Sequence, residues 1–238
     1  MSNPLFYIEP HTEPTLEILL SEETSKHIAQ VLRKQIGDSI DLTDGRGWLY
    51  TTTIIDNHKK KCRVKIERKK FTEKPNHQLC MAVSLLKNAS RFEWFLEKAT
   101  EIGIIEIIPL RCSRTEKQHF RMDRMKGILM SAMLQSQQQW LPVLHEPTDF
   151  ELVIRTREDT QKFIAHCEPD QKNELAATLK GNTTNGILLI GPEGDFTPAE
   201  ISLAIANGYV PVALGNTRLR TETAALVGAV LMAQQFSQ

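Results

Sequence analysis

Short stretches of alternating apolar and polar residues fill the first third of the chain. The β-prone stretches are 6–8, 15–20, 39–43, 48–55 and 62–67, and Asp44-Gly-Arg-Gly47 is a turn signal between two of them. One helix interrupts them: Ser21 begins it, and the spacing places Ile28, Val31 and Leu32 on one apolar face. This pattern predicts a small β-barrel with a single short helix.

After Pro75 and Asn76, strand-like and helix-like stretches alternate. We expect strands at 78–86, 104–110, 163–166, 187–190 and 209–214, and helices at 91–102, 121–139, 173–179 and 221–236. Strands separated by helices of this length predict an α/β domain with a mostly parallel sheet covered on both faces. The domain boundaries are therefore 1–74 and 75–238.

Charge is balanced over the whole chain, with 29 Lys and Arg against 29 Asp and Glu, but it is distributed unevenly. Residues 57–74 hold nine basic residues and two Glu, whereas residues 1–56 hold four basic and nine acidic ones. This basic run suits the phosphate backbone of a nucleic acid, or is a solvated edge strand whose lysines prevent aggregation.

No apolar run approaches the roughly 20 residues that would span a bilayer, and the N-terminus lacks a signal segment. We therefore expect a cytoplasmic protein without a membrane partner. The four cysteines, Cys62, Cys80, Cys112 and Cys167, lack the spacing of a metal or redox site, so we expect reduced, mostly buried thiols and no metal.

Two segments near the C-terminus carry the candidate chemistry. Residues 188–196 and 213–225 each begin as a buried strand, break at a glycine, carry charge and enter a helix. Thr197-Pro-Ala-Glu200 is a capping box, which places the first loop at a positive helix end. Neither phosphate-binding glycine motif is present, and Glu193 and Asp195 would repel a polyphosphate, so a neutral or cationic ligand fits better. The last helix, 221–236, is rich in small residues and is apolar on nearly all sides. It is therefore either a core helix of one subunit or a helix that also packs against a second subunit.

The pairing of Leu189-Ile-Gly-Pro-Glu-Gly194 with Leu214-Gly-x-x-x-Leu-Arg-Thr-Glu-Thr-Ala224 closely resembles the RsmE family of ribosomal small subunit methyltransferases, in the SPOUT superfamily. Shorter matches run along nearly the whole chain, among them His27-x-x-x-Val-Leu-Arg33, Glu97-Lys-Ala-Thr-Glu-Ile-Gly103 and Lys87 with Arg91.

The resemblance implies a PUA-like β-barrel that holds RNA, followed by a SPOUT domain whose C-terminal trefoil knot binds S-adenosylmethionine. It also implies a homodimer that methylates N3 of one uridine in 16S rRNA of the assembled 30S subunit. The cofactor-binding residues it implies are Leu189, Ile190, Gly191, Pro192, Glu193, Gly194, Leu214, Gly215, Leu219, Arg220, Thr223 and Ala224. Together with the basic run, it implies RNA contacts by His27, Arg33, Lys59, Lys60, Lys61, Arg63, Lys87, Arg91, Arg111 and Arg114.

For catalysis, Arg220 is the expected donor that stabilises charge on a uracil carbonyl, and either Glu222 or Glu193 accepts the N3 proton. The chain departs from the family pattern at Asp195, where a glycine is usual, and at Gln138, where an arginine is usual. Arg111, Arg114 or Lys117 are the candidates to replace that arginine. Two rival interpretations remain: a SPOUT enzyme that methylates the ribose 2′-oxygen, and a non-catalytic RNA-binding assembly factor.

Overall fold

The computed structural model describes residues 3–10, 16–76, 78–116, 119–169, 172–179 and 185–236. Lys117 and Thr15 lie outside these ranges. Internal contacts divide the chain into two compact units, Met1–Lys74 with Met133–Leu141, and Pro75–Ala132 with Pro142–Gln238. The return of Met133–Leu141 to the first unit is not visible in the sequence pattern. It follows from backbone pairing, because Gly47 N–H donates to the Gln139 carbonyl at 2.9 Å.

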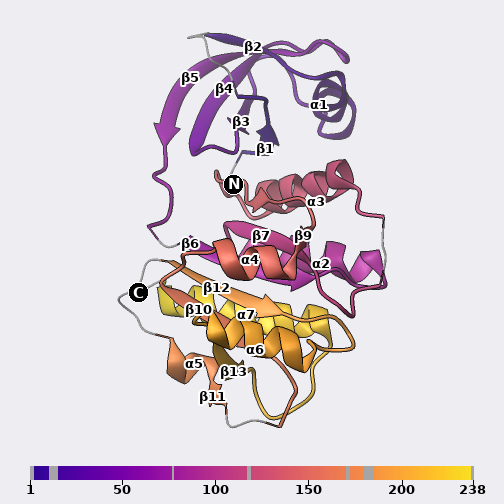
Figure 1. Ribbon diagram of the computed structural model, residues 1–238. Coiled ribbons are helices and arrows are strands. Elements are labelled where there is room, and N and C mark those ends of the chain that lie inside the picture. Colours follow the sequence, from indigo (N-terminus) through magenta and orange to yellow (C-terminus); the bar gives the residue numbers. More distant parts are fainter. Residues whose placement is uncertain are drawn as a thin grey trace. The chain divides into compact units, whose positions relative to one another are not determined.

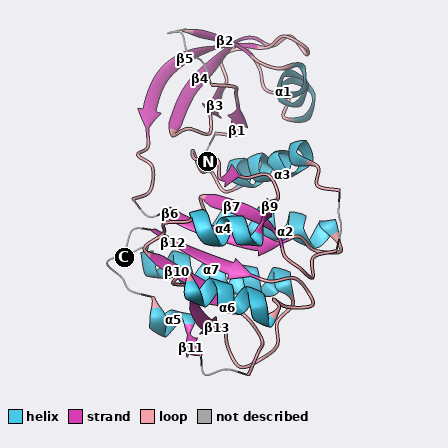
Figure 2. Ribbon diagram, viewed as in Figure 1, coloured by secondary structure: helices cyan, strands magenta, loops and turns pink. Residues whose placement is uncertain are grey.

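The first unit is a five-stranded mixed sheet with one helical segment (Figures 1 and 2). Its strand order is β1-β3-β4-β5-β2, in which β1 pairs with β3 in parallel and the other neighbours are antiparallel. The strands are β1 (Leu5–Tyr7), β2 (Glu17–Leu19), β3 (Ser39–Thr43), β4 (Trp48–Asp56) and β5 (Arg63–Phe71). Alternate residues such as Ile40, Leu42, Ile54 and Val64 are fully buried, as the period of two predicts.

The helical segment begins where the sequence predicts. Helix α1 (Glu22–Lys26) starts after Ser21, whose Oγ accepts the N–H of Thr24 at 3.1 Å. It then widens into a π-helical turn, η1 (His27–Val31), in which the Leu32 N–H donates to the His27 carbonyl at 3.0 Å.

The prediction of one buried face on this segment is wrong for two of its three residues. Ile28 is fully buried, but Val31 is 66% and Leu32 38% exposed. The π-turn adds one residue between the donor and the acceptor of the backbone hydrogen bond, and this extra residue rotates positions 31 and 32 away from the side that Ile28 occupies. Arg33 ends the segment with a left-handed backbone, φ 53°.

The second unit is a parallel sheet of order β11-β13-β10-β12-β6-β7-β8, with β9 paired to β7. Every recorded strand pair among its described residues is parallel. The strands are β6 (Gln78–Ser84), β7 (Glu106–Arg111), β8 (Val143–Leu144), β9 (Thr148–Asp149), β10 (Gln161–Ala165), β11 (Asn173–Glu174), β12 (Asn185–Ile190) and β13 (Val210–Ala213). The helices are α2 (Ala89–Ile102), α3 (Met122–Gln135), α4 (Phe150–Thr156), α5 (Leu175–Thr178), α6 (Pro198–Ala206) and α7 (Thr221–Phe236). The predicted α/β class with a parallel sheet is confirmed.

Helices cover both faces of this sheet. On one face α7 packs on β6 and β12 and against α2, while α4 and α6 pack together on the other. A Cβ on Gly228 would overlap the side chain of Leu188, so glycine lets α7 lie directly on β12. Helix α7 is therefore a helix of its own sheet's core. The described helices include none with the length and apolarity needed to span a membrane.

Several boundaries differ from the predictions for local reasons. Gly103, with φ 96°, ends α2 as predicted. Helix α3 stops at Gln135 instead of 139, and Gln137 just beyond it has a left-handed backbone, φ 58°. The sequence pattern did not indicate α4, whose apolar residues include Phe150, Val153 and Ile154.

The cysteine prediction is confirmed: all four thiols are free, and Cys62, Cys80 and Cys112 are buried. Burial raises the pKa of Cys62 to about 11 and that of Cys112 to about 12, so both stay protonated at neutral pH. Cys167 is the exposed one.

Candidate functional site

The carboxyl ends of three adjacent parallel strands meet in the second unit. Strand β10 lies between β12 and β13, so the segments that leave these strands, 165–167, 191–197 and 214–220, come together. In open α/β sheets this edge is where ligands bind. The two glycine-broken segments of the sequence are thus joined by a third that carries no sequence signal.

The loop after β12 is held by its own backbone and by Asp195. The Asp195 N–H donates to the Pro192 carbonyl at 2.9 Å, and Asp195 has φ 63°. Its carboxylate accepts the N–H of Cys167 at 2.7 Å and that of Phe196 at 2.8 Å. The left-handed backbone accounts for the usual glycine here, because only Gly and, less readily, Asn or Asp adopt it without large strain. The aspartate adds a bond to the 165–167 segment that glycine could not make.

Gly191 opens the same loop under steric constraint. A Cβ at this position would lie 3.0 Å from the ring of Phe196 and 3.2 Å from its backbone nitrogen. An added Cβ would require Phe196, which is fully buried in the core between β12 and α6, to shift by a few tenths of an ångström.

The predicted capping box at the start of α6 is confirmed. Thr197 Oγ1 accepts the Glu200 N–H at 3.2 Å, and Glu200 Oε2 accepts the Thr197 N–H at 2.8 Å. The other oxygen of Glu200 accepts the Ser113 N–H at 2.8 Å. Burial alone raises the pKa of Glu200, but the hydrogen bonds from Thr197 and Ser113 outweigh it and leave the pKa below its usual value.

Two of the predicted RNA-contacting arginines have partners within the protein. The Arg114 guanidinium holds this loop: it donates to the Gly194 carbonyl at 2.7 Å and to the Phe196 carbonyl at 3.4 Å. Arg111 forms an exposed ion pair with Asp149 at 2.8 Å, directly before α4. Their role as substitutes for the arginine expected at position 138 stays a prediction.

The loop after β13 is held by fewer contacts than the loop after β12. Gly215 has φ 114°, and residues 215–218 are exposed. Within the described ranges, no side-chain hydrogen bond reaches residues 214–219, and none of them forms an ion pair.

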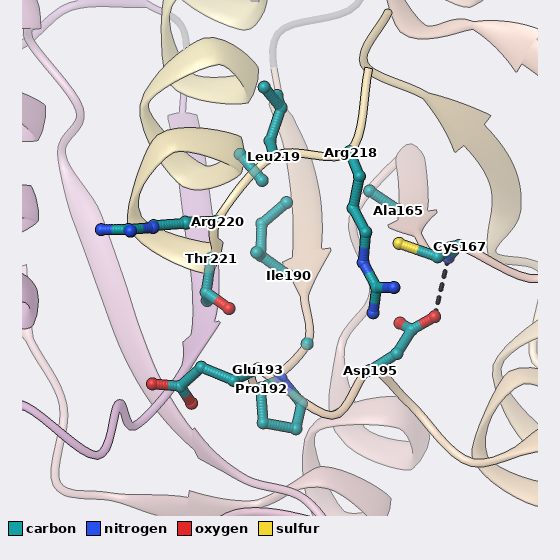
Figure 3. A pocket seen from close by; sticks show the side chains of 12 residues that line it. Ala165, Cys167, Ile190, Pro192, Glu193, Asp195, Arg218, Leu219, Arg220 and Thr221 are labelled. Carbon is teal, nitrogen blue, oxygen red and sulfur yellow. Dashed lines mark hydrogen bonds between the residues drawn. The ribbon is translucent and has the colours of Figure 1, made fainter. Parts of the chain in front are cut away.

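These segments enclose a pocket of about 400 Å³ (Figure 3). The view shows Arg218 directed to the side that bears Asp195, while Arg220 extends the opposite way, away from Asp195. An adjoining pocket of about 380 Å³ continues along the second loop. The first pocket is lined by Ala165, Cys167, Ile190, Gly191, Pro192, Glu193, Asp195, Arg218, Leu219, Arg220, Thr221 and Ala224.

Most of the residues expected to bind the cofactor lie on these walls. Seven of them line the first pocket, namely Ile190, Gly191, Pro192, Glu193, Leu219, Arg220 and Ala224, and Leu214 and Gly215 line the second. Leu189 is instead fully buried in the core on the α4 and α6 side of the sheet. Gly194 and Thr223 are absent from both linings.

Glu222 is buried next to the pocket without lining it. It is 8% exposed, and its Oε1 lies 3.6 Å from Nε of Arg91. Its Oε2 has no hydrogen-bond partner among the described residues. The predicted RNA contact Arg91 therefore reaches the predicted catalytic Glu222 through an ion pair.

Sequence reasoning missed the walls supplied by Ala165, Cys167, Arg218 and Thr221. Arg218 and Thr221 lie in the second segment, 213–225, but are not among the residues expected to bind the cofactor. Ala165 and Cys167 lie at the end of the strand predicted at 163–166, where no motif marks a site, and only the strand order, with β10 between β12 and β13, could have placed them here.

The remaining predicted RNA contacts are scattered over each unit. In the first unit His27 packs edge-on against Phe6 at 5.7 Å, Lys60 pairs with Glu22 at 3.0 Å, and Arg63 lies 3.8 Å from both Glu17 and Asp56. Arg33, Lys59 and Lys61 are exposed. In the second unit Lys87 pairs with Glu116 at 3.3 Å, and its N–H donates to Glu193 at 3.2 Å.

The described residues contain no group of three or more His, Cys, Asp or Glu side chains arranged to hold a metal ion.

Comparison with known proteins identifies the family. A family model for the RNA methyltransferase domain matches residues 72–233, and one for the RNA methyltransferase PUA domain matches residues 20–67. The chain is 30% identical to the ribosomal RNA small subunit methyltransferase E of Synechocystis, over 88% of this chain and 70% of that protein.

Solved structures agree over nearly the full length. One is described as a probable rRNA-methyltransferase from Porphyromonas gingivalis, with 33% identity, a TM-score of 0.90 and 98% of both chains covered. Another is a methyltransferase from Legionella pneumophila in complex with the cofactor SAM, with 27% identity, a TM-score of 0.87 and 98% of both chains covered. With the PUA and methyltransferase models both matched in the expected order, the chain belongs to the family of ribosomal RNA small subunit methyltransferases E.

Proposed function

We propose that this chain transfers a methyl group from S-adenosylmethionine to N3 of one uridine in 16S rRNA, within the assembled 30S subunit. The observation that carries the proposal is the pocket, because the residues that carry the family motif converge on it from two separate segments. The relative from Legionella, solved with this cofactor, supports the choice of ligand.

The pocket has the size and chemistry for this cofactor. Its volume of about 400 Å³, continued by the adjoining pocket, is within the range of roughly 300–1,000 Å³ of ligand sites. Ile190, Leu219 and Ala224 supply apolar walls for a flat base, and the carboxylates of Glu193 and Asp195 favour a sulfonium cation. When bound, the cofactor supplies a methyl group open to in-line displacement.

The protein must help the uracil N3 to lose its proton, because little of the imide anion exists at neutral pH. Arg220 is the donor that stabilises charge on an adjacent carbonyl as the proton leaves. Glu193 is exposed on the pocket wall and can reach the base, whereas Glu222 is buried beside Arg91. We therefore assign proton acceptance to Glu193 and a positioning role to Glu222, acting through Arg91.

The working unit in this proposal is a homodimer, and the trefoil knot stays part of the prediction. Four apolar residues of α7 are only half-buried, namely Leu226, Val227, Val230 and Leu231. A second copy would remove this surface from water. Sedimentation equilibrium is expected to give a dimer at micromolar concentration, and a monomer would remove this part of the proposal.

The direct test is incubation of purified 30S subunits that lack the modification with labelled S-adenosylmethionine, followed by nucleoside mass spectrometry and mapping. We expect 3-methyluridine at a single position. A ribose 2′-O-methyl product, or the absence of cofactor binding by calorimetry, would contradict the proposal.

Arg220→Ala is the matching variant. It is expected to abolish methylation and to leave cofactor affinity nearly unchanged, because its role begins only when charge develops on the base. Arg155→Ala, which removes an exposed arginine of α4, is the control and should retain full activity.

A further inference from the structure

The first unit carries a cluster of four aromatic side chains, of which two are exposed while Tyr50 is buried. Trp48 of β4 lies directly opposite Phe71 of β5, with ring centroids 5.0 Å apart, and they are 37% and 47% exposed. Tyr50 stacks beside Trp48 at 6.3 Å, and Trp140 contacts Phe71 edge-on at 6.1 Å. We call these four residues the aromatic platform.

The turn at 44–47 holds the platform in place. Gly47 has φ 96°, and a Cβ there would lie 2.7 Å from both the Thr72 carbonyl and the Trp140 ring. Thr72 N–H donates to the Gly47 carbonyl at 2.9 Å, and Trp140 Nε1 donates to the Thr72 carbonyl at 3.0 Å.

The side chain of Asp44 holds this turn through hydrogen bonds to its backbone. It is 6% exposed, and its Oδ1 accepts the N–H groups of Arg46 and Trp48 at 2.8 and 3.3 Å. The rings are thus fixed before any partner arrives, so binding costs little side-chain entropy.

Unpaired positive charge lies next to the platform. Arg68, Lys69 and Lys70 directly precede Phe71 and are exposed. Because side chains alternate along a strand, Lys69 lies on the face of Phe71, where its Nζ is 5.6 Å from the centre of the Tyr50 ring, whereas Arg68 and Lys70 lie on the other face. Among the described residues no carboxylate pairs with these three.

The other half of the basic run is different. Lys60, Arg63 and Lys65 all have carboxylate partners within 4.0 Å, Glu22, Glu17 with Asp56, and Glu67 respectively. Lys59 and Lys61 of that half are exposed but lie before β5, so within β5 (Arg63–Phe71) the described cations without a carboxylate partner are at its aromatic end.

We propose that the aromatic platform stacks an unpaired base of single-stranded RNA while Lys69 contacts an adjoining phosphate; the choice of RNA rests on the proposed function. Unstacked bases present flat faces that aromatic rings recognise, whereas the bases of a duplex are covered. An apolar protein surface would cover the rings but would leave Lys69 without a carboxylate partner, at a cost in free energy.

The test is fluorescence anisotropy of a labelled, unstructured oligouridylate with the full-length protein in the absence of cofactor. Trp48→Ala is expected to lower affinity about 10-fold or more, and Trp48→Phe to retain most of it, because stacking is worth roughly 1–3 kcal/mol per base. Lys69→Gln should reduce the salt slope by about one, while Trp48→Ala leaves it unchanged.

Leu19→Ala, which removes an exposed apolar side chain from β2 of the same unit, is the control and should bind normally. An unchanged affinity of Trp48→Ala for oligouridylate would overturn the role of the platform in RNA binding. If this variant changed its sedimentation but not its RNA affinity, the platform would instead bind a protein partner or a second copy.

Cofactor binding and methylation of 30S subunits by the same variants separate the two proposals. If the wild-type protein binds no S-adenosylmethionine, the proposed function is refuted. The effect of Trp48→Ala on oligouridylate affinity tests the aromatic platform and does not depend on that result.

Discussion

The two loops that build the pocket are stabilised very differently. The loop at 191–197 is held by Arg114, by both oxygens of Asp195 and by the capping box of α6. The loop at 214–219 receives no side-chain hydrogen bond from the described residues, and most of it is exposed. The first loop is therefore formed before a ligand binds, and we expect the ligand to order the second.

The same contrast holds for the glutamates that follow the loops. Glu200 and Glu222 are each 8% exposed and lie in the first turns of α6 and α7. Both oxygens of Glu200 accept backbone hydrogen bonds, whereas Glu222 has one distant arginine and an Oε2 without a described partner. Although the two glutamates are equally buried, Glu200 stabilises the fold through its hydrogen bonds, whereas Glu222 retains one oxygen that can still accept a hydrogen bond.

The largest expected effect is that of Glu200→Ala. Thr197 still caps α6 in this variant, but loss of the carboxylate that accepts the Thr197 and Ser113 N–H groups should lower the free energy of unfolding by about 3 kcal/mol. Chemical denaturation measures it, and Glu151→Ala, on exposed α4 surface, is the control. A loss comparable to that of the control would mean that the first loop is not held by its carboxylate.

The pH dependence follows from the lowered pKa of Glu200. A carboxyl whose folded pKa is below its unfolded value adds stability above the unfolded pKa and loses it as pH falls through the folded pKa. Wild type should therefore lose more stability on acidification below about pH 5 than Glu200→Gln does.

Asp195 gives the next largest effect. Asp195→Ala removes two hydrogen bonds and leaves a β-carbon at φ 63°, so we expect a loss of about 2 kcal/mol. Asp195→Gly loses the bonds but relieves the strain, and should lose about half as much. Equal losses in the two variants would show that the left-handed backbone at Asp195 does not strain a residue with a β-carbon.

The sequence predicted the regular parts of the fold and the charged walls of the site. Strand β3 and helix α7 begin and end at the predicted residues, because alternation and helix periodicity are local signals. The π-turn at 27–31 and the return of Met133–Leu141 to the first unit depend on tertiary contacts that periodicity cannot express.

The site shows the same limit. Ile190–Glu193 and Leu219–Arg220 could be named from motifs, but Ala165 and Cys167 are brought to them only by the position of β10 in the sheet. The partner of a charged group was also unpredictable: Arg114 and Arg91 looked like RNA contacts and are engaged with Gly194 and Glu222.

Glu222→Gln should have little effect on stability. Because the carboxylate has one unpartnered oxygen, an amide of the same shape should change the free energy of unfolding by less than about 0.5 kcal/mol, in contrast to Glu200. If Glu222 positions the site through Arg91, methylation should fall while cofactor affinity is retained, and Arg91→Lys should restore part of the activity lost in Arg91→Ala. A large loss of stability in Glu222→Gln would place both glutamates in the same structural role.

The smallest effect on stability, and the sharpest test of the comparison, concerns Arg218. Arg218→Ala should leave the unfolding of the free protein unchanged, since the side chain is exposed and unpaired in the described structure. The stabilisation by added S-adenosylmethionine should shrink, because it depends on the ratio of ligand concentration to Kd. In wild type, hydrogen exchange of the amides at 215–218 should slow on cofactor addition, while the amides of Asp195 and Thr197 are protected in both states. Equal protection of both loops without cofactor would mean that the second loop is as preformed as the first.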